Sequence, residues 1–186
     1  ADTDTRVMLY VGRLSPEKEV DVLIKSFHAL QEQQGENVKF VIVGEGPDRV
    51  RLGKLTSSKD VIFTGSLSGQ ALSEAYASAD VFTFASQADT FGNVVLEAIA
   101  SGLPVVAYDY VCAHQYVKQE VTGWLSPLGH TSDLIQSICH LPALPKLRQM
   151  GLLASESVQE NSWQLPVQQL EQALYQVAKE SPMTST

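Results

Sequence analysis

Residues 81–107 read VFTFASQADTFGNVVLEAIASGLPVVA, and this segment decides the fold class. The apolar runs at 81–84 and 104–107 are typical of strands that are buried on both faces of a sheet. Between them come a loop, Gly92, a short helical stretch and Gly102. A strand, a helix and a strand in this order predict one βαβ unit of a parallel sheet.

The same alternation continues on both sides of this segment. Further strand-like runs lie at 7–11, 38–43, 61–63 and 124–125, and helical patterns lie between them. Only helical patterns follow, the last of them at 167–177. The sequence therefore predicts an α/β fold with a doubly wound, Rossmann-like parallel sheet, whose ligands bind beyond the carboxyl ends of the strands. No repeat or low-complexity linker divides the chain, so we expect residues 1–186 to form a single domain.

Composition and charge exclude several classes of function. The 186 residues carry 13 basic and 21 acidic side chains, and the formal net charge of −8 opposes binding to nucleic acid. Cys112 and Cys139 have neither CxxC spacing nor a zinc-like histidine pattern, so we expect reduced thiols. No apolar stretch approaches the roughly 20 residues of a membrane span, and the N-terminus is polar. We expect a soluble cytoplasmic protein.

The loop and helix start within the opening segment carry candidate ligand-binding groups. Gly92 lets the backbone approach a ligand closely. The amides of Asn93 and Val94, at the positive end of the helix, suit a phosphate. Glu97 lies about one and a half turns into the helix, where it can accept hydrogen bonds from a ribose diol. Asp89 stands in the loop and can hold a sugar hydroxyl. A packing role for the glycine and the carboxylate is the alternative.

A second polar segment follows the first predicted strand, and residues 11–21 read VGRLSPEKEVD. Arg13 offers a planar fork for phosphate oxygens and Lys18 offers a point charge, so the two cations suit a diphosphate. We expect the backbone of Gly12 to contact the same donor. Taken alone, both cations would be solvated surface charges. Residues 43–47 read VGEGP, which fails the GxGxxG fingerprint, and no NAD site is expected.

The opening segment resembles, nearly position by position, the acidic-x7-acidic signature of glycosyltransferase family 4, in which two glutamates flank Gly-Phe-Gly. Here Asp89 replaces the first glutamate and Thr90 replaces the usual glycine, whereas Phe91, Gly92 and Glu97 match. The resemblance implies that Phe91 and Gly92 line the donor site. It also implies that Asp89 contacts the sugar and Glu97 the ribose.

The resemblance extends over essentially the whole chain. It implies that Arg13 and Lys18 grip the donor diphosphate. It further implies that the loop with Ser66 and Leu67 lies along the nucleobase, mostly through backbone groups. The alternative for this loop is a plain turn in which Ser68 caps the next helix.

Family likeness implies a retaining glycosyltransferase with the GT-B fold, which has two Rossmann-like domains. This chain would be the C-terminal donor domain, and the N-terminal acceptor domain would be absent. The nucleotide sugar, with a UDP-sugar favoured, would be a substrate rather than a cofactor, and the acceptor would be a sugar or a lipid. The missing domain would also be the part that places the enzyme at the inner face of the membrane. No DxD pair follows a predicted strand, so no metal ion is expected.

Two alternatives stay open. The same motifs permit a non-catalytic nucleotide-sugar-binding module, and they permit a GT-B-type nucleotide-sugar epimerase, which would need no acceptor. The histidines match no catalytic position, and we expect them to be surface or packing residues: His28, His114, His130 and His140. Because the acceptor side of the cleft and its catalytic groups would lie on the absent domain, we expect the chain by itself to be inactive in transfer.

Overall fold

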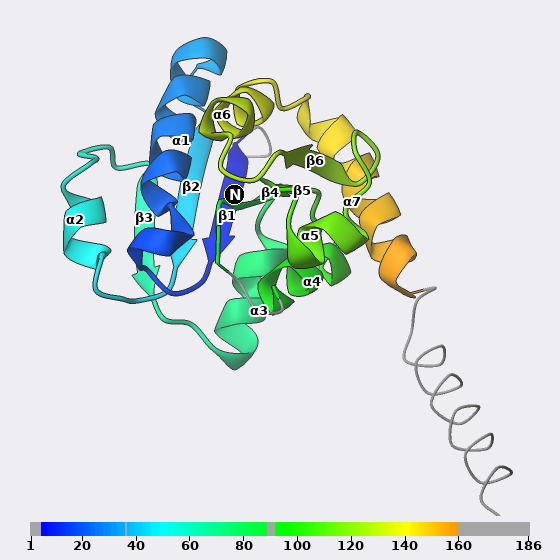
Figure 1. Ribbon diagram of the computed structural model, residues 1–186, viewed down its shortest axis with the longest axis horizontal. Helices are drawn as coiled ribbons and strands as arrows, with labels where there is room; N and C mark the ends of the chain where they lie inside the picture. The colour runs from blue at the N-terminus through cyan, green and yellow to red at the C-terminus, as the bar shows by residue number, and fades with distance from the viewer. Residues whose placement is uncertain (1–4, 36, 89–91, 160–186) are drawn as a thin grey trace, which may run out of the picture.

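The computed structural model describes residues 5–35, 37–88 and 92–159. Asp89 and Phe91 of the predicted donor site, and the helix predicted at 167–177, lie outside the described residues. Six described strands form one parallel sheet in the order β3-β2-β1-β4-β5-β6 (Figure 1). The strands are β1 (Arg6–Val11), β2 (Val38–Val43), β3 (Val61–Gly65), β4 (Val81–Phe84), β5 (Val105–Tyr108) and β6 (Gly123–Ser126). This order is that of a doubly wound fold and confirms the predicted class.

The strands coincide with the apolar runs because the sheet is covered on both faces. Every residue of β4 and β5 is buried, so these strands read as continuous apolar runs without alternation. Strand β3 extends two residues beyond the predicted run, to Gly65. Strand β5 begins at Val105 rather than at Pro104, which has no amide hydrogen for a ladder.

Helices connect the strands and form the two outer layers. They are the 3-10 helix η1 (Pro16–Lys18), α1 (Val20–Gln34), α2 (Arg49–Gly53), α3 (Gly69–Ala77), α4 (Asn93–Ala100), α5 (Val111–Tyr116), α6 (Thr131–Cys139) and α7 (Leu144–Gln159). Crossovers between parallel strands are almost always right-handed. Because β2 and β5 lie on opposite sides of the central pair β1 and β4, α1 and α4 cover opposite faces. α1 packs against α6, and α4 packs against α7 (Figure 1).

An aromatic layer supports the carboxyl ends of the central strands. Tyr10 near the end of β1 and Phe84 at the end of β4 have ring centroids 6.1 Å apart, and Phe82 lies 6.0 Å from Phe84. All three rings are buried. Buried rings of this size dominate core packing, so the loops that follow β1 and β4 start from a rigid base.

Candidate functional site at the carboxyl edge of the sheet

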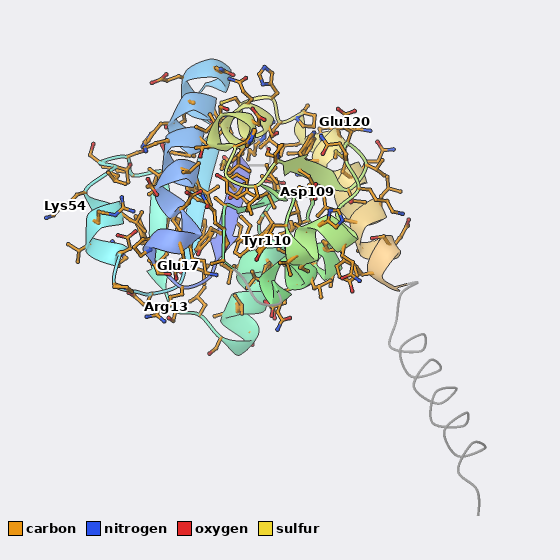
Figure 2. The ribbon with its side chains drawn as sticks, in the orientation of Figure 1. Arg13, Glu17, Lys54, Asp109, Tyr110 and Glu120 are labelled. Carbon is orange, nitrogen blue, oxygen red and sulfur yellow. The ribbon has the colours of Figure 1, made fainter. Side chains whose placement is uncertain are left out.

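The strand order changes direction between β1 and β4. The chain moves outward from β1 to β2 and β3, and it moves outward on the other side from β4 to β5 and β6. Ligands of doubly wound folds bind at this switch point, outside the carboxyl ends of the strands. The loops 12–19 and 85–88 follow β1 and β4, and Figure 2 shows Arg13 and Glu17 at the edge where β1 ends.

Lys18 joins the two loops at the switch point. Its Nζ donates hydrogen bonds to Oγ of Ser86 at 3.1 Å and to the carbonyl oxygen of Ala88 at 2.9 Å. It also lies 5.9 Å from the ring centre of Phe84, within cation–π range. The ammonium group is thus held against residues 86–88 of the loop after β4. Ser86 had no predicted role, although a serine two residues after the end of a buried strand was the available signal.

The backbone of the loop after β1 packs against the loop after β2. The amide of Gly12 donates to the carbonyl oxygen of Val43 at 3.0 Å. A Cβ added at Gly44 would lie 1.9 Å from the carbonyl oxygen of Gly12, and one at Gly46 would lie 2.1 Å from that of Leu14. The two glycines of the VGEGP segment therefore permit this close approach, a role that was not predicted.

A carboxylate accompanies the two predicted phosphate ligands. Glu17 is exposed, and the Ser15 hydroxyl donates to its Oε1 at 2.5 Å. That bond first, then a backbone hydrogen bond and the charges of Lys18 and Arg13, lower the pKa of Glu17. An ionised Glu17 offsets part of the positive charge of Arg13 and Lys18, which the sequence-based prediction did not include.

Gly92 places the first turn of α4 at the same edge. Its φ of 62° lies in the left-handed region, and a Cβ there would lie 2.7 Å from the Cβ of Cys112. Both conditions favour glycine. The amides of Asn93 and Val94 belong to the first turn and have no acceptor within the helix. Because Gly92 has no side chain to cap them, the helix start can offer these amides and its dipole to an anion.

Glu97 is exposed on α4 and is oriented by a neighbouring helix. Its Oε2 accepts a hydrogen bond of 2.9 Å from the hydroxyl group of Tyr76 in α3. The same hydroxyl lies 3.5 Å from the carbonyl oxygen of Val94. Burial, followed by the bond to Glu97, raises the pKa of Tyr76, so this group stays a donor. No local sequence pattern indicated this partner.

The loop predicted to lie along the nucleobase follows β3, farther out in the sheet. Ser66 is exposed, and Leu67 packs partly against the core. Ser68 occupies the N-cap position of α3 with an extended backbone, but its side chain makes no capping hydrogen bond. The alternative interpretation of this loop is therefore supported in the position of Ser68 but not in the capping bond. The exposed hydroxyl can bond water instead, at little net cost.

A cavity of about 610 Å³ lies at the opposite, amino edge of the sheet. Residues that precede three strands line part of it, namely Thr5 before β1, Asp80 before β4 and Leu103 before β5. Because ligands of this fold class bind at the carboxyl edge, we do not assign this cavity to the donor site.

Four further observations concern the cysteines, a histidine, metal-binding groups and membrane-spanning helices. Cys112 and Cys139 are both buried, and they are not linked to each other by a disulfide bond. His114 forms an exposed pair with Asp109, with Nδ1 and Oδ1 2.7 Å apart. Among the residues that the structure describes, no group of three or more histidine, cysteine, aspartate or glutamate side chains is placed to hold a metal ion. Within residues 5–35, 37–88 and 92–159, no helix has the length and apolar character needed to cross a membrane.

Comparison with known proteins decides the family. A model of the family described as "Glycosyl transferases group 1" matches residues 1–151. The chain belongs to this family. The six-stranded parallel sheet is accordingly one Rossmann-like half of the GT-B fold.

Relatives of this glycosyl transferase chain match most of its length. A GDP-mannose-dependent alpha-mannosyltransferase of Mycobacterium tuberculosis is 39% identical over 155 residues, which are 83% of this chain and 38% of the relative. A sulfoquinovosyl transferase of Arabidopsis thaliana is 33% identical over 179 residues, 92% of this chain and 34% of the relative. The structure of Anabaena HepE in complex with UDP and glucose matches with a TM-score of 0.76 at 25% identity, covering 93% of this chain and 49% of HepE. The glycosyl transferase chain thus spans 34% to 38% of the length of these two curated relatives.

Proposed function

We propose that residues 1–186 are the donor domain of a retaining hexosyltransferase and bind a nucleotide sugar for transfer to an acceptor hydroxyl. One observation carries this proposal: Lys18 is held across the switch point, at the edge where Gly92 precedes the first turn of α4. This is the crevice in which doubly wound folds bind their ligands. A cation and an uncapped helix start at one edge suit the diphosphate of such a donor.

The proposed chemistry is stabilisation of a leaving group. As the bond to the anomeric carbon breaks, negative charge grows on the distal phosphate, and the acceptor hydroxyl attacks from the same face. Arg13, Lys18 and the amides of Asn93 and Val94 stabilise that charge, which lowers the barrier because the interaction strengthens in the transition state. The departing phosphate takes the acceptor proton. Glu97 binds the ribose.

The remaining ligand contacts complete the proposed donor site. Asp89 and Phe91 contact the sugar side of the donor, Gly12 contacts the diphosphate through its backbone, and the loop with Ser66 and Leu67 lies along the base. We favour UDP as the nucleotide, supported by the complex of HepE with UDP and glucose. GDP is the alternative outcome, because the mannosyltransferase at 39% identity is GDP-mannose-dependent.

We further propose that a second Rossmann-like domain supplies the acceptor side and that the chain alone transfers no sugar. The share of the relatives' length that the chain spans supports this division. Transfer of sugar from UDP-glucose to any acceptor by the purified chain would contradict this part of the proposal.

A thermal-shift panel with UDP, GDP and ADP tests the binding function directly. The preferred nucleotide, at about 100 times its Kd, should add roughly 2.7 kcal/mol to the free energy of unfolding. For a domain of this size that corresponds to a rise in Tm of roughly 5 to 10 °C. If none of the three nucleotides shifts the Tm or gives heat in calorimetry, the proposed function is wrong.

A further inference from the structure

Glu19 combines an unusual backbone conformation with a side chain that bonds to two other elements. It precedes α1 with φ 45° and ψ 39°, in the left-handed region where glycine is favoured over residues with a Cβ. Such a conformation persists only where the surroundings hold it, and it is found preferentially at functional sites. The contacts of the Glu19 side chain therefore bear on whether it has a role in the site.

Both carboxylate oxygens of Glu19 accept hydrogen bonds from residues at the carboxyl edge. Nε2 of Gln87, in the loop after β4, donates to Oε1 at 2.6 Å. The hydroxyl of Tyr108, at the end of β5, donates to Oε2 at 2.9 Å. The Tyr108 hydroxyl also lies 3.3 Å from Oγ1 of Thr131, the first residue of α6. The side chain of Glu19 thus connects the loop after β1 to the loop after β4 and to the end of β5.

These bonds lie beside those of Lys18. The amide of Gln87 donates to the carbonyl oxygen of Glu17 at 3.1 Å, and Lys18 reaches Ser86 and Ala88 on either side of Gln87. We call residues 17–19 together with 86–88 the loop clamp. Within the loop clamp, both carboxylate oxygens of Glu19 accept hydrogen bonds from protein donors. We therefore assign Glu19 no direct contact with the donor.

We infer that Glu19 is a positioning residue, which holds the loop clamp closed so that Lys18 meets the diphosphate of the donor. This inference rests on the proposed function. Glu19 contacts no substrate in this role; it fixes the spacing between the cation after β1 and the loop that leads to Asp89. The competing idea is that Glu19 only supports the fold.

Glu19→Gly separates the two ideas. Glycine relieves the left-handed backbone and removes both side-chain bonds, so the two effects on the Tm oppose each other. If Glu19 positions Lys18, the Kd of the nucleoside diphosphate, measured by calorimetry, should rise by about tenfold, on the scale of one or two lost hydrogen bonds. Unchanged affinity in a folded Glu19→Gly variant would overturn the inference.

Two further variants, Glu19→Gln and Gln87→Ala, test the inference independently of how Glu19→Gly folds. Glu19→Gln keeps an acceptor for Gln87 and a polar group for Tyr108, so it should restore affinity to within about threefold of the wild type if geometry is what matters. If Glu19→Gly and Glu19→Gln both bind more tightly than the wild type, Glu19 acts by charge repulsion and the positioning role is wrong. Should Glu19→Gly fail to fold, Gln87→Ala at an exposed position must still weaken binding; unchanged affinity there would also overturn the inference.

The chain offers a matched control in Glu120. Like Glu19 it has a left-handed backbone, with φ 61°, although Glu120 is exposed and Glu19 is half-buried, and Figure 2 shows Glu120 on a different side of the molecule from Glu17. Glu120→Gly should leave the affinity unchanged, and an equal loss in both glycine variants would contradict a specific role for Glu19. The probes are UDP, GDP and ADP. Wild-type protein that binds none of them would overturn the proposed function, and this inference with it, whereas normal wild-type binding isolates the question of Glu19.

Discussion

The hydroxyl group of Tyr76 donates a hydrogen bond of 2.9 Å to Oε2 of Glu97 and so joins α3 to α4. The tyrosine is buried and the glutamate is exposed. A carboxylate that is oriented from the protein side and remains accessible to solvent is well placed to accept a ligand hydroxyl. The bond therefore agrees with the proposed role of Glu97 at the ribose, and because Glu97 is exposed, the bond rather than burial orients its carboxylate.

Glu97→Gln should weaken binding of the preferred nucleoside diphosphate by about 10- to 100-fold, because hydrogen bonds to a charged group contribute roughly 1.5 to 3 kcal/mol. The Tm without ligand should stay nearly unchanged, since Glu97 is exposed. Calorimetry and thermal unfolding measure the two quantities. Unchanged affinity together with a large drop in Tm would instead assign Glu97 to the fold.

Two controls sharpen this result. A 2′-deoxy nucleotide should bind the wild type less well and should be little affected by Glu97→Gln. Tyr76→Phe keeps the buried ring and removes the donor, so its effect on affinity should be less than additive with that of Glu97→Gln. Additive effects would show that Tyr76 and Glu97 act independently.

Lys18→Met should raise the Kd of the nucleoside diphosphate by about 10- to 100-fold, measured by calorimetry in the presence of a chelator. The reason is that Lys18 supplies a fixed charge across the switch point, and we expect the wild type to bind without an added metal ion. Lys39→Met is the matched control, because Lys39 is exposed and lines the cavity at the amino edge. Binding that appears only with magnesium or manganese, or an equal loss in both variants, would contradict the assignment.

Gly92→Ala should lower the free energy of unfolding by more than Gly129→Ala does. Both glycines have positive φ, 62° and 78°, so both substitutions carry a cost of about 1 to 2 kcal/mol for a left-handed residue. A Cβ at Gly129 meets nothing within 4 Å, whereas one at Gly92 would lie 2.7 Å from the Cβ of Cys112. Urea unfolding measures the difference, and equal losses would mean that the contact with Cys112 relaxes without strain.

Stability should fall as the pH rises from about 10 to about 12. Burial first, and then the bond to Glu19, raises the pKa of Tyr108 from 10.0 to about 12. The folded chain therefore keeps this proton where the unfolded chain has lost it, and the contribution is complete below pH 10 and lost through pH 12. Tyr108→Phe should flatten the dependence of the urea midpoint on pH in this window, with Tyr110→Phe as the control at an exposed position. The same pH dependence in Tyr108→Phe as in the wild type would contradict this account.

The sequence by itself determined the fold class and most of the strand positions. Residues 81–84 and 105–107 of the two apolar runs lie in strands whose every residue is buried, and such strands leave a local apolar signal that does not depend on which elements pack against them. The strand order follows almost as directly, because right-handed crossovers restrict how βαβ units can assemble. Lys18 and Gly92 were predicted to lie at the carboxyl edge, and both do, because each follows a strand and the carboxyl ends of parallel strands share an edge.

Only the tertiary structure decided the partners of the site residues. Tyr76 and Glu97 are 21 residues apart, and Tyr108 and Glu19 are 89 residues apart, so no local period connects them. Their contacts depend on the directions of side chains after the helices have packed on the sheet, and side-chain direction changes with each residue of a helix or strand. For the same reason the sequence could offer Ser68 as an alternative N-cap of α3 but could not show that its side chain makes no capping hydrogen bond. A sequence pattern determines which residues reach the edge of the sheet, whereas packing between distant elements determines what each one contacts there.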